Sequence, residues 1–492
     1  MLCTMPNRRL ATQLMAGTII CLLFLSLAVP ASRMTLREFI QRPESAAGPP
    51  PPAPPAKDEP KKEPPHPKYK PTPTYLPPPI KDNFPLLATS TPPPIPKWNV
   101  PRPDMHKEYD LPVPPPLLIG FTRTWPLLLQ AVVSYITAGW PASQIYVVEN
   151  TGVQQANARG QLTLQNPFYL NHTVLKTLGV NIIQTPTLLT FAQLQNFFLH
   201  LTYDKNWPYY FWSHMDVLAL SYENGQEGLT PRYDEPGYKT IYELSLAALK
   251  DAREKEPRWA IRFFAYDHLA LVNPVAFEGV GGWDTLIPYY LTDCDMHSRL
   301  RFGKWNMEDR SAGHVFDVAS TLDDLSVLYR VDGVEAKWTD PNPPLPGKEG
   351  EKKTGPWWQW GNRRKAKREG EGVGLGEIPS GKGIERRGGE TKMEARDEED
   401  PNLSKWFLIK QTADQMFQHK HGGRERNTWQ VGQHGGEGEP FHYDPAGFAE
   451  GLDVIIEAGR EVYRRKWGHR DCDLLEAGLK TEDAWRVLKD WE

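Results

Sequence analysis

Short apolar runs alternate with longer apolar stretches from residue 117 onward. The run at 117–121 predicts a buried strand, and the stretch at 127–138 predicts a helix that Pro126 begins and that Gly139 and Pro141 end. The same pattern predicts a helix at 191–201 and further strands at 145–148, 180–183 and 209–212. This β-α-β-β-α-β order favours an α/β fold with a mainly parallel central sheet.

The most apolar segment lies near the N-terminus. Residues 10–29 carry no charged side chain and follow Arg8 and Arg9. As a helix they would span ~30 Å, the thickness of a bilayer's hydrocarbon core. We therefore expect a cytoplasmic tail at 1–9 and a signal anchor at 10–30, with a cleaved signal peptide as the alternative. The anchor predicts a single-pass type II protein of the Golgi or another secretory-pathway membrane, with the rest of the chain lumenal.

Proline is concentrated behind this segment. More than half of the chain's 48 prolines lie between residues 43 and 116. Such runs, interleaved with Lys and Glu, favour extended polyproline II, so we expect residues 31–116 to be a disordered stem. A tract recognised by proline-binding modules is the alternative. The charged, glycine-rich stretch 341–400 predicts a disordered insertion. Residues 117–340 and 401–492 remain for one domain, with or without a C-terminal extension.

Composition narrows the classes of function. A net charge of −4 gives the chain no overall attraction to nucleic acid, and its 17 tryptophans exclude wholesale disorder. Cys294 and Cys472 are the two cysteines that follow the predicted anchor. An oxidising lumen would allow them to pair, and two separate buried thiols are the alternative. The acceptor triplets at Asn171 and Asn402 agree with glycosylation in that compartment.

Polar side chains collect where the predicted strands end. Three strands are followed by such residues, namely Thr122 and Arg123, Glu149 and Asn150, and His214 and Asp216. Because the carboxyl ends of parallel strands share one edge of a sheet, we expect these side chains to converge on one ligand. Positions i and i+2 of an extended segment point to the same side, so an imidazole and a carboxylate could together hold a divalent cation.

The densest group of candidate functional residues follows later. Gly281-Gly282-Trp283-Asp284 offers a tight loop and a flat aromatic face of the kind that stacks on sugars. Asp293 and Asp295 come next, near an expected helix start. One carboxylate placed to take a proton from a hydroxyl is what general-base transfer requires. In isolation, two acids at a helix start are also explained by the helix dipole.

Together these motifs resemble inverting, nucleotide-sugar-dependent glycosyltransferases of the GT-A fold, closest to the family 2 type. The first two strand ends match in Gly120-Phe121-Thr122-Arg123 and Val147-Val148-Glu149-Asn150. The most specific match is Gly281-Gly282-Trp283-Asp284 followed by Asp293-Cys294-Asp295 and Arg299-Leu300. The segment from Tyr463 to Gly468 resembles the closing Lys-Trp-Gly of fungal-type relatives.

The resemblance implies a role for each matched residue. Asp293 would be the catalytic base, and Mn²⁺ or Mg²⁺ would be held by Asp216, His214 and His314. The nucleotide sugar would be bound by Thr122, Arg123, Glu149, Asn150, Asn196 and His214. The acceptor would be bound by Gly282, Trp283, Asp284 and Asp295. Two positions depart from the family pattern, because His214 replaces the first acid of the metal motif and Thr292 replaces the Glu before the base.

The sequence therefore predicts a membrane-anchored, hexosyltransferase-like enzyme. It would move a sugar from a nucleotide-sugar donor to a hydroxyl of a glycan, glycoprotein or glycolipid, with inversion and metal assistance, and no nucleic acid partner is expected. A catalytically inactive GT-A-fold protein, binding carbohydrate or acting as a scaffold in the secretory pathway, is the alternative that His214 suggests. A hydrolase with paired carboxylates is a third, which the closeness of Asp293 and Asp295 disfavours.

Overall fold

A computed structural model describes residues 66–71, 77–340, 400–421, 432–439 and 444–491. The chain divides into two units, Met1–Thr72 and Pro73–Glu492, and the helices and strands reported below lie in the second. The predicted tail and anchor, the first part of the predicted stem, and residues 341–399 of the predicted insertion lie outside the described residues. No helix in the described ranges has both the length and the apolar character needed to cross a membrane.

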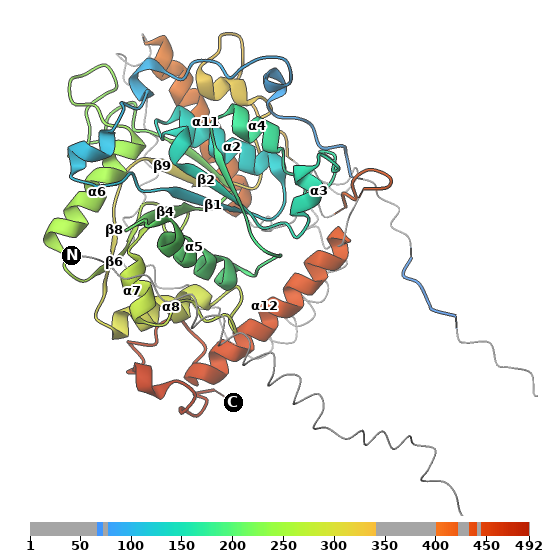
Figure 1. The fold of residues 1–492 in the computed structure, drawn as a ribbon, viewed down its shortest axis with the longest axis vertical. Helices are drawn as coiled ribbons and strands as arrows, with labels where there is room; N and C mark the ends of the chain where they lie inside the picture. The colour runs from blue at the N-terminus through green and yellow to red at the C-terminus, as the bar shows by residue number, and fades with distance from the viewer. Residues whose placement is uncertain (1–65, 72–76, 341–399, 422–431, 440–443, 492) are drawn as a thin grey trace, which may run out of the picture. The chain divides into compact units, whose positions relative to one another are not determined.

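The central sheet of the described chain has seven strands in the order β3-β2-β1-β4-β7-β6-β8 (Figure 1). They are β1 Leu117–Phe121, β2 Ile145–Glu149, β3 Asn181–Gln184, β4 Tyr210–Ser213, β6 Trp259–Phe263, β7 Leu269–Val272 and β8 Asn306–Asp309. The first four strands in this order are parallel, β7 is antiparallel to both of its neighbours, and β6 and β8 are parallel. A small second sheet pairs β5 Val217–Leu220 with β9 His314–Asp317.

Helices cover both faces of the sheet. They are α2 Trp125–Thr137, α3 Gln154–Ala158, α4 His172–Thr177, α5 Phe191–Lys205, α6 Ile241–Lys255, α7 Pro274–Gly279, α8 Thr292–Phe302, α11 Pro401–His421 and α12 Pro445–Trp467. Short 3-10 turns are η2 Pro85–Ala88, η3 Lys97–Asn99, η4 Met105–Tyr109, η5 Ala142–Gln144, η6 Leu325–Tyr329 and η7 Thr481–Asp483. The mainly parallel α/β sheet is confirmed, and each predicted element starts within about two residues of its predicted start. The short helices α3 and α4 were not predicted, because neither is long enough to show a clear period.

The sheet has a hydrophobic core on each side because alternate strand residues point to opposite faces. Leu117 and Ile119 of β1 belong to the core that α2, α6 and part of α11 complete. Leu118 belongs to the core on the other face, which α5, α7 and α8 cover. Helices α5 and α6 each begin at a threonine whose side chain forms a capping box, Thr190 and Thr240. These caps set where both helices leave the strand-end loops.

The predicted stem is too long at its C-terminal end. Phe84, Met105 and Leu111 are buried in the core, and Asn99 is fully buried. Asn99 donates hydrogen bonds to the Thr137 carbonyl at 2.8 Å and to Glu223 at 2.9 Å. Proline prevents regular structure but not packing, so apolar residues between the prolines contribute to the core. The boundary predicted at residue 116 is therefore wrong, and packed structure begins before Phe84.

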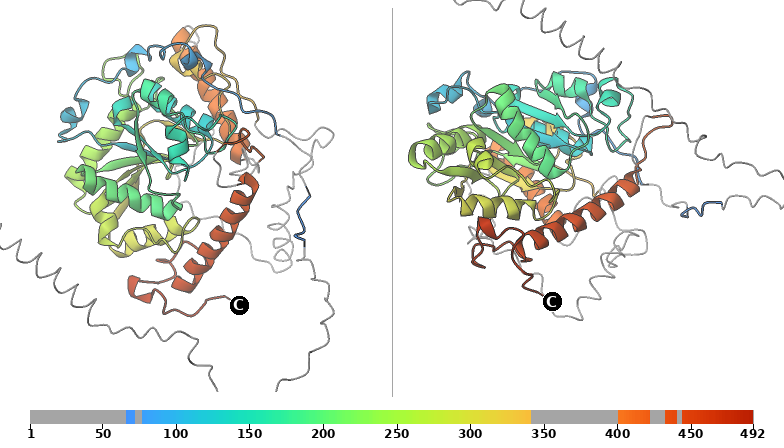
Figure 2. Two further views of the ribbon diagram at one scale, coloured as in Figure 1. Left: turned by 45° about the vertical axis from the view of Figure 1, so that its right-hand side comes forward. Right: turned by 60° about the horizontal axis from the view of Figure 1, so that its bottom comes forward.

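The two C-terminal helices attach to different parts of the domain. Helix α11 packs on β9 and buries Trp406, Ile409 and Met416. Helix α12 runs along the outside of the domain beside α8 (Figure 2). Tyr463 and Trp467 anchor its C-terminal end in a small core that includes Cys294 and Cys472. These two cysteines form a disulfide, which decides between the two alternatives that the sequence left open.

We expect Cys472→Ser to lower the free energy of unfolding by about 2–5 kcal/mol, because the bond closes a long loop and restricts the unfolded chain. The sequence separation is 178 residues. The measurement is the urea midpoint of the full-length protein, with dithiothreitol-treated wild type as the matched control, which should show the same loss. An unchanged midpoint, together with two free thiols in a non-reducing peptide map, would contradict the disulfide.

Candidate functional site

The sheet changes direction of growth between β1 and β4. From β1 the chain builds outward through β2 to β3, and then returns to place β4 on the other side of β1. Open α/β sheets bind ligands outside the carboxyl ends of the strands at such a switch point. Thr122 and Arg123 follow β1, and His214 and Asp216 follow β4, so the fold places both predicted pairs at this edge.

His214 lies between two carboxylates. Its Nδ1 is 3.7 Å from Asp216 Oδ1, and its Nε2 is 3.5 Å from Asp267 Oδ2. Burial alone would lower the pKa of His214, but the charges of Asp267 and Asp216 raise it to about 10. Burial alone would raise the pKa of Asp267, and His214 instead lowers it to about 2. The imidazole is therefore a cation at neutral pH, held by two anions.

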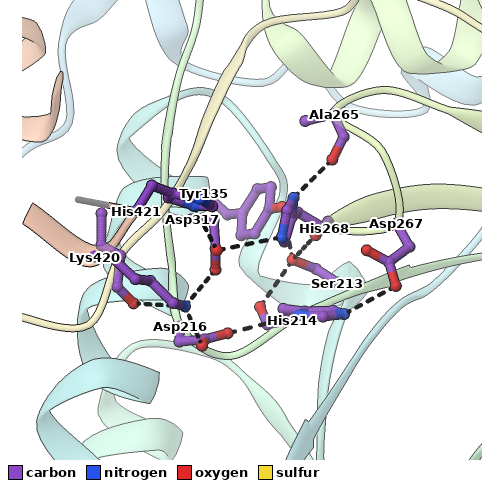
Figure 3. Close-up of polar contacts among 11 residues, drawn as sticks. Tyr135, Ser213, His214, Asp216, Ala265, Asp267, His268, Asp317, Lys420 and His421 are labelled. Carbon is purple, nitrogen blue, oxygen red and sulfur yellow. Dashed lines mark hydrogen bonds and ion pairs between the residues drawn. The ribbon is translucent and has the colours of Figure 1, made fainter. Parts of the chain in front are cut away.

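Lys420 joins this group from the last turn of α11 (Figure 3). Its Nζ donates to Asp216 Oδ2 at 2.7 Å and to Asp317 Oδ1 at 2.5 Å. Burial alone would lower the pKa of Lys420, but the two carboxylates raise it. For Asp216, burial would raise the pKa, whereas Lys420 and then His214 lower it. The Lys420 ammonium and the Asp216 carboxylate are therefore charged together.

Two further histidines complete what we call the strand-end cluster, which is His214, Asp216, Asp267, His268, Asp317, Lys420 and His421. The Nε2 atoms of His268 and His421 lie 3.6 Å and 3.0 Å from Asp317 Oδ2. The Nδ1 of His268 faces the Ala265 carbonyl at 2.9 Å. Burial and then the nearby charge of His214 lower the pKa of His268, so this ring is neutral at pH 7.

The metal ligands expected from the sequence do not come together. In the β5–β9 pair, Asp317 is opposite Val217, whereas His314 is opposite Leu220 at the other end of β9. The His314 ring packs against aromatic neighbours, Tyr222, Phe316 and Trp406. The assignment of His314 is therefore wrong, because a strand rises ~3.3 Å per residue and three residues separate it from Asp317. The residue that meets Asp216 is Lys420, whose ammonium is a cation itself, so the residues do not fit a resident Mn²⁺ or Mg²⁺.

Glu149, the acid expected to contact the nucleotide, is fully buried. Its Oε1 accepts a hydrogen bond from Asn157 at 2.8 Å. Its Oε2 accepts one from Gln184 at 2.9 Å and lies 2.9 Å from His172 Nε2. Both oxygens thus hold α3, α4 and the end of β3 in place. A role in binding the nucleotide stays a prediction for this residue.

Two predicted asparagines each brace a backbone segment from both sides. Asn150 accepts from the Leu189 amide at 2.7 Å and donates to its carbonyl at 2.9 Å. Asn196 makes the same pair of bonds with Trp283, at 2.8 Å and 2.9 Å. A Cβ at Gly282, whose φ is +69°, would lie 2.9 Å from Asn196 Oδ1, so only glycine fits this loop. Glycine is needed at this position because the backbone of the loop passes close to α5.

The predicted acceptor residues are mostly structural. Trp283 is 4 % exposed and packs against Phe191 and Phe277, so it has no open face for a sugar. Lys466 of α12 pairs with Asp284 at 2.6 Å and with the fully buried Asp295 at 2.7 Å. These acids attach α12 to the domain. Their assignment to acceptor binding is therefore corrected, because their oxygens are used within the chain.

Asp295 makes further contacts of the same kind. Arg299 approaches its Oδ2 through two nitrogens, at 2.8 Å and 2.7 Å, and Trp467 donates to its Oδ1 at 3.0 Å. The negative charge of this buried carboxylate is compensated by an arginine, through two nitrogens, and by a lysine. Removal of the carboxylate would take away a partner from each of these cations.

Asp293, the predicted base, lies beside the strand-end cluster. It is half-buried and accepts a hydrogen bond from Tyr266 Oη at 3.0 Å. Tyr266 precedes Asp267 and His268 in the turn between β6 and β7, where its φ is +51°. The His297 ring lies on the same side of α8, one turn after Asp293, and burial lowers its pKa. The structure thus brings the predicted base and the His214 region to one turn.

The β1 end contributes a buried cation. Arg123 is 7 % exposed, and its guanidinium lies over the Phe448 ring at 5.2 Å. Burial lowers the pKa of Arg123 to about 10, which leaves it charged at neutral pH. Thr122 accepts a hydrogen bond from Asn150 Nδ2 at 3.4 Å. An arginine at a strand end suits an anionic ligand such as a diphosphate.

Sequence reasoning missed most of the strand-end cluster. The missed members are Asp267, His268, Asp317, Lys420 and His421. Tyr266, which donates a hydrogen bond to Asp293 beside the cluster, was missed as well. A usable signal was the polar turn between the apolar runs 259–263 and 269–272, which predicts a hairpin whose turn residues are at the sheet edge. Nothing local points to Lys420, because it lies 204 residues after Asp216.

A separate group of possible metal ligands follows α12. The ligand atoms of His469, Asp471 and Asp473 lie within 4.8 Å of one another and could hold an ion. His469 Nε2 is 2.7 Å from Asp473 and its Nδ1 pairs with Asp490. Exposed groups of this kind are common without a metal, and this one carries no assignment here.

Comparisons with known proteins show only distant likeness. No protein-family model and no curated protein matches the chain. A cytidylyltransferase from Leptospira borgpetersenii is similar over 40 % of this chain and 76 % of its own, with 9 % identity and a TM-score of 0.26. A mannosyltransferase from Pyrobaculum calidifontis, solved with GDP-Man and Mn²⁺, is similar over 42 % of this chain and 60 % of its own, with 13 % identity and a TM-score of 0.26. Likeness at this level supports no conclusion about function.

We expect Asp295→Ala to lower the free energy of unfolding by about 3–5 kcal/mol, because Arg299 would lose its carboxylate partner and Lys466 would lose one of its two in a buried place. The measurement is the chemical denaturation midpoint. The matched control is Glu457→Ala on the exposed side of α12, where the ion pair with Arg460 is worth about 1 kcal/mol or less. Equal, small losses for both variants would contradict a role for Asp295 in attaching α12 to the domain.

Proposed function

We propose that this protein is a glycosyltransferase of the GT-A type, which transfers a sugar from a nucleotide-sugar donor to an acceptor hydroxyl. The observation that carries the proposal is the switch point between β1 and β4, with charged residues at both strand ends and Asp293 beside them. The order of sequence motifs supports it, since the predicted base stands on α8 beside the turn that carries Asp267 and His268. A hexose donor and inversion of the anomeric centre are part of the proposal.

Asp293 would act as the general base. Its carboxylate takes the proton of the acceptor hydroxyl while the hydroxyl oxygen forms a bond to the anomeric carbon. The bond from that carbon to the diphosphate oxygen breaks, and its electron pair leaves with the nucleoside diphosphate. Attack opposite the leaving group inverts the anomeric centre. The hydrogen bond from Tyr266 at 3.0 Å holds the carboxylate in one orientation for this step.

The donor would lie across the ends of β1 and β4. Arg123 and Thr122 stand at one side and His214 at the other, so cationic groups flank the place proposed for the diphosphate. The Mn²⁺ or Mg²⁺ that the resemblance implies is not part of the proposal, because Asp216 already pairs with Lys420.

The proposals on location and acceptor rest mainly on the sequence. We propose a type II anchor at residues 10–30 and a lumenal catalytic domain in the Golgi or another secretory-pathway membrane. The acceptor would then be a glycan, glycoprotein or glycolipid. The disulfide between Cys294 and Cys472 supports an oxidising compartment.

One observation favours a second candidate function. Both oxygens of Glu149, and both the oxygen and the nitrogen of the Asn150 side-chain amide, are used inside the chain, although the family resemblance implies nucleotide contacts there. A catalytically inactive GT-A-fold protein that binds carbohydrate or serves as a scaffold would show this arrangement. Release of nucleotide from a donor separates the two candidates, since only an enzyme releases it.

We expect Asp293→Asn to reduce transfer by about 10²–10⁴-fold, because an amide cannot accept the acceptor's proton. The full-length protein in detergent is incubated with UDP-glucose, UDP-galactose, UDP-N-acetylglucosamine and GDP-mannose, and the released nucleoside diphosphate is measured. Donor binding by calorimetry should stay within about twofold, since Asp293 does not contact the diphosphate in this proposal.

The matched control is Asp204→Asn on the outer end of α5, an exposed carboxylate paired with Lys205. It should transfer at the wild-type rate. A fully active Asp293→Asn variant would remove Asp293 as the base. Donor binding by wild type without any nucleotide release would favour the inactive candidate instead.

A further inference from the structure

The ammonium group of Lys420 is fixed on all three of its N–H bonds. It donates to Asp216 Oδ2 at 2.7 Å, to Asp317 Oδ1 at 2.5 Å and to the Val318 carbonyl at 3.3 Å. The Lys420 side chain is 4 % exposed, and Asp317 is 3 % exposed. A buried ammonium ion with this set of oxygen partners is held as firmly as a bound cation would be.

The other two carboxylate oxygens also face nitrogen atoms of the chain. Asp216 Oδ1 lies 3.7 Å from His214 Nδ1. Asp317 Oδ2 lies 3.0 Å from His421 Nε2 and 3.6 Å from His268 Nε2 (Figure 3). Mn²⁺ and Mg²⁺ bind through carboxylate oxygens, and Mg²⁺ needs those oxygens at 2.0–2.1 Å from the ion. The nitrogen atoms that face the oxygens of Asp216 and Asp317 occupy the space in which such an ion would have to lie. All four oxygens of Asp216 and Asp317 therefore lie beside a nitrogen atom of the chain.

We propose that the Lys420 ammonium is the resident cation of this site and occupies the position between Asp216 and Asp317 that a divalent ion would need. Glycosyl transfer by this protein then proceeds without a divalent metal ion. This inference rests on the proposed function, and it adds that Lys420 is a positioning residue, which acts by holding the two acids at the ends of β4 and β9.

The helix that carries Lys420 favours a cation at this place. Lys420 is the next-to-last residue of α11, where the helix dipole is negative and a positive charge is stabilised. Leu403, Trp406 and Met416 bury the apolar face of α11 against the domain, so the end of the helix is held at the sheet edge. His214, in place of the first acid of the metal motif, removes one oxygen ligand from the same site. Lys420 and His214 thus both make the site less suited to a divalent metal ion.

Removal of the lysine should expose the underlying ligand set. In Lys420→Ala the carboxylates of Asp216 and Asp317 would face each other without their cation, and repulsion between them would favour a divalent ion. The variant should therefore gain a Mn²⁺ site that the wild type lacks. A lysine with a purely structural role would not produce such a gain, so this readout tests the positioning role directly.

The experiment uses the full-length protein and has two readouts. Nucleotide release is measured in EDTA and in Mn²⁺, and Mn²⁺ binding is measured by electron paramagnetic resonance. Every protein in the binding readout also carries Asp473→Ala, which removes the possible ligand group after α12. We expect wild-type release to change by less than about twofold with EDTA, and Lys420→Ala to lose more than about tenfold in EDTA and recover in Mn²⁺.

Two control variants accompany these measurements. Lys410→Ala removes a lysine from the same helix, whose partner is Asp414 four residues later, and it should neither lose release nor gain Mn²⁺. Lys420→Met keeps most of the apolar part of the lysine side chain and removes only its charge. It therefore tests the role of the charge with less loss of packing, in case Lys420→Ala does not fold. It should gain the same Mn²⁺ site.

The possible failures are distinguishable. Wild-type release that EDTA abolishes and Mn²⁺ restores would overturn this inference and leave the proposed function standing. Folded Lys420 variants that bind no Mn²⁺ would also overturn it. Absence of release by wild type with every donor in both EDTA and Mn²⁺ would instead reject the proposed function, and the binding readout would still decide whether Lys420 is the resident cation.

Discussion

A buried ammonium ion has to be matched by negative charge, and this requirement organises the edge of the sheet. Lys420 meets it with Asp216 and Asp317, which stand at the ends of β4 and β9. The pairing therefore ties the central sheet, the small sheet and α11 to one another. Without these two acids the lysine would be uncompensated in a buried place, where a single unpaired charge costs several kcal/mol. The same contacts set the charge that a ligand at this edge would meet.

A second buried charge network attaches helix α12 to the domain. Asp295 and Asp284 receive Lys466 from α12, and the disulfide fixes the segment after that helix to α8. The family pattern predicts that these acids bind the acceptor, but here they attach a C-terminal helix to the domain. Asp293, between them in sequence, keeps a half-buried carboxylate with one hydrogen bond from Tyr266. Position on the helix separates these roles, because Asp293 and Asp295 lie about 200° apart around its axis.

Much of the α/β domain was predictable from local pattern. Strand β1 and helix α2 follow from one apolar run and one proline-started stretch, since burial of both elements needs only consecutive apolar residues. The hydrophobic pattern failed to predict the packing of segments that are neither helix nor strand, because such segments have no regular spacing of apolar residues. The prolines before residue 117 indicated a stem, although Phe84 and Asn99 are buried in the domain. Extended chain can pack without a repeat, so composition alone cannot show where a proline-rich segment becomes part of a core.

The candidate site, like the fold, could be predicted from the sequence only in part. The sequence by itself placed His214 and Asp216 at a strand end and Asp293 near a helix start, because strand ends and helix starts are local properties. Only the tertiary structure decided what those residues meet. Asp216 and Lys420 are 204 residues apart, and His314 is removed from the site by the register of β9. Partners across such distances are set by the packing of whole elements, which no short window of sequence contains, and here that packing placed a lysine where a metal ion was expected.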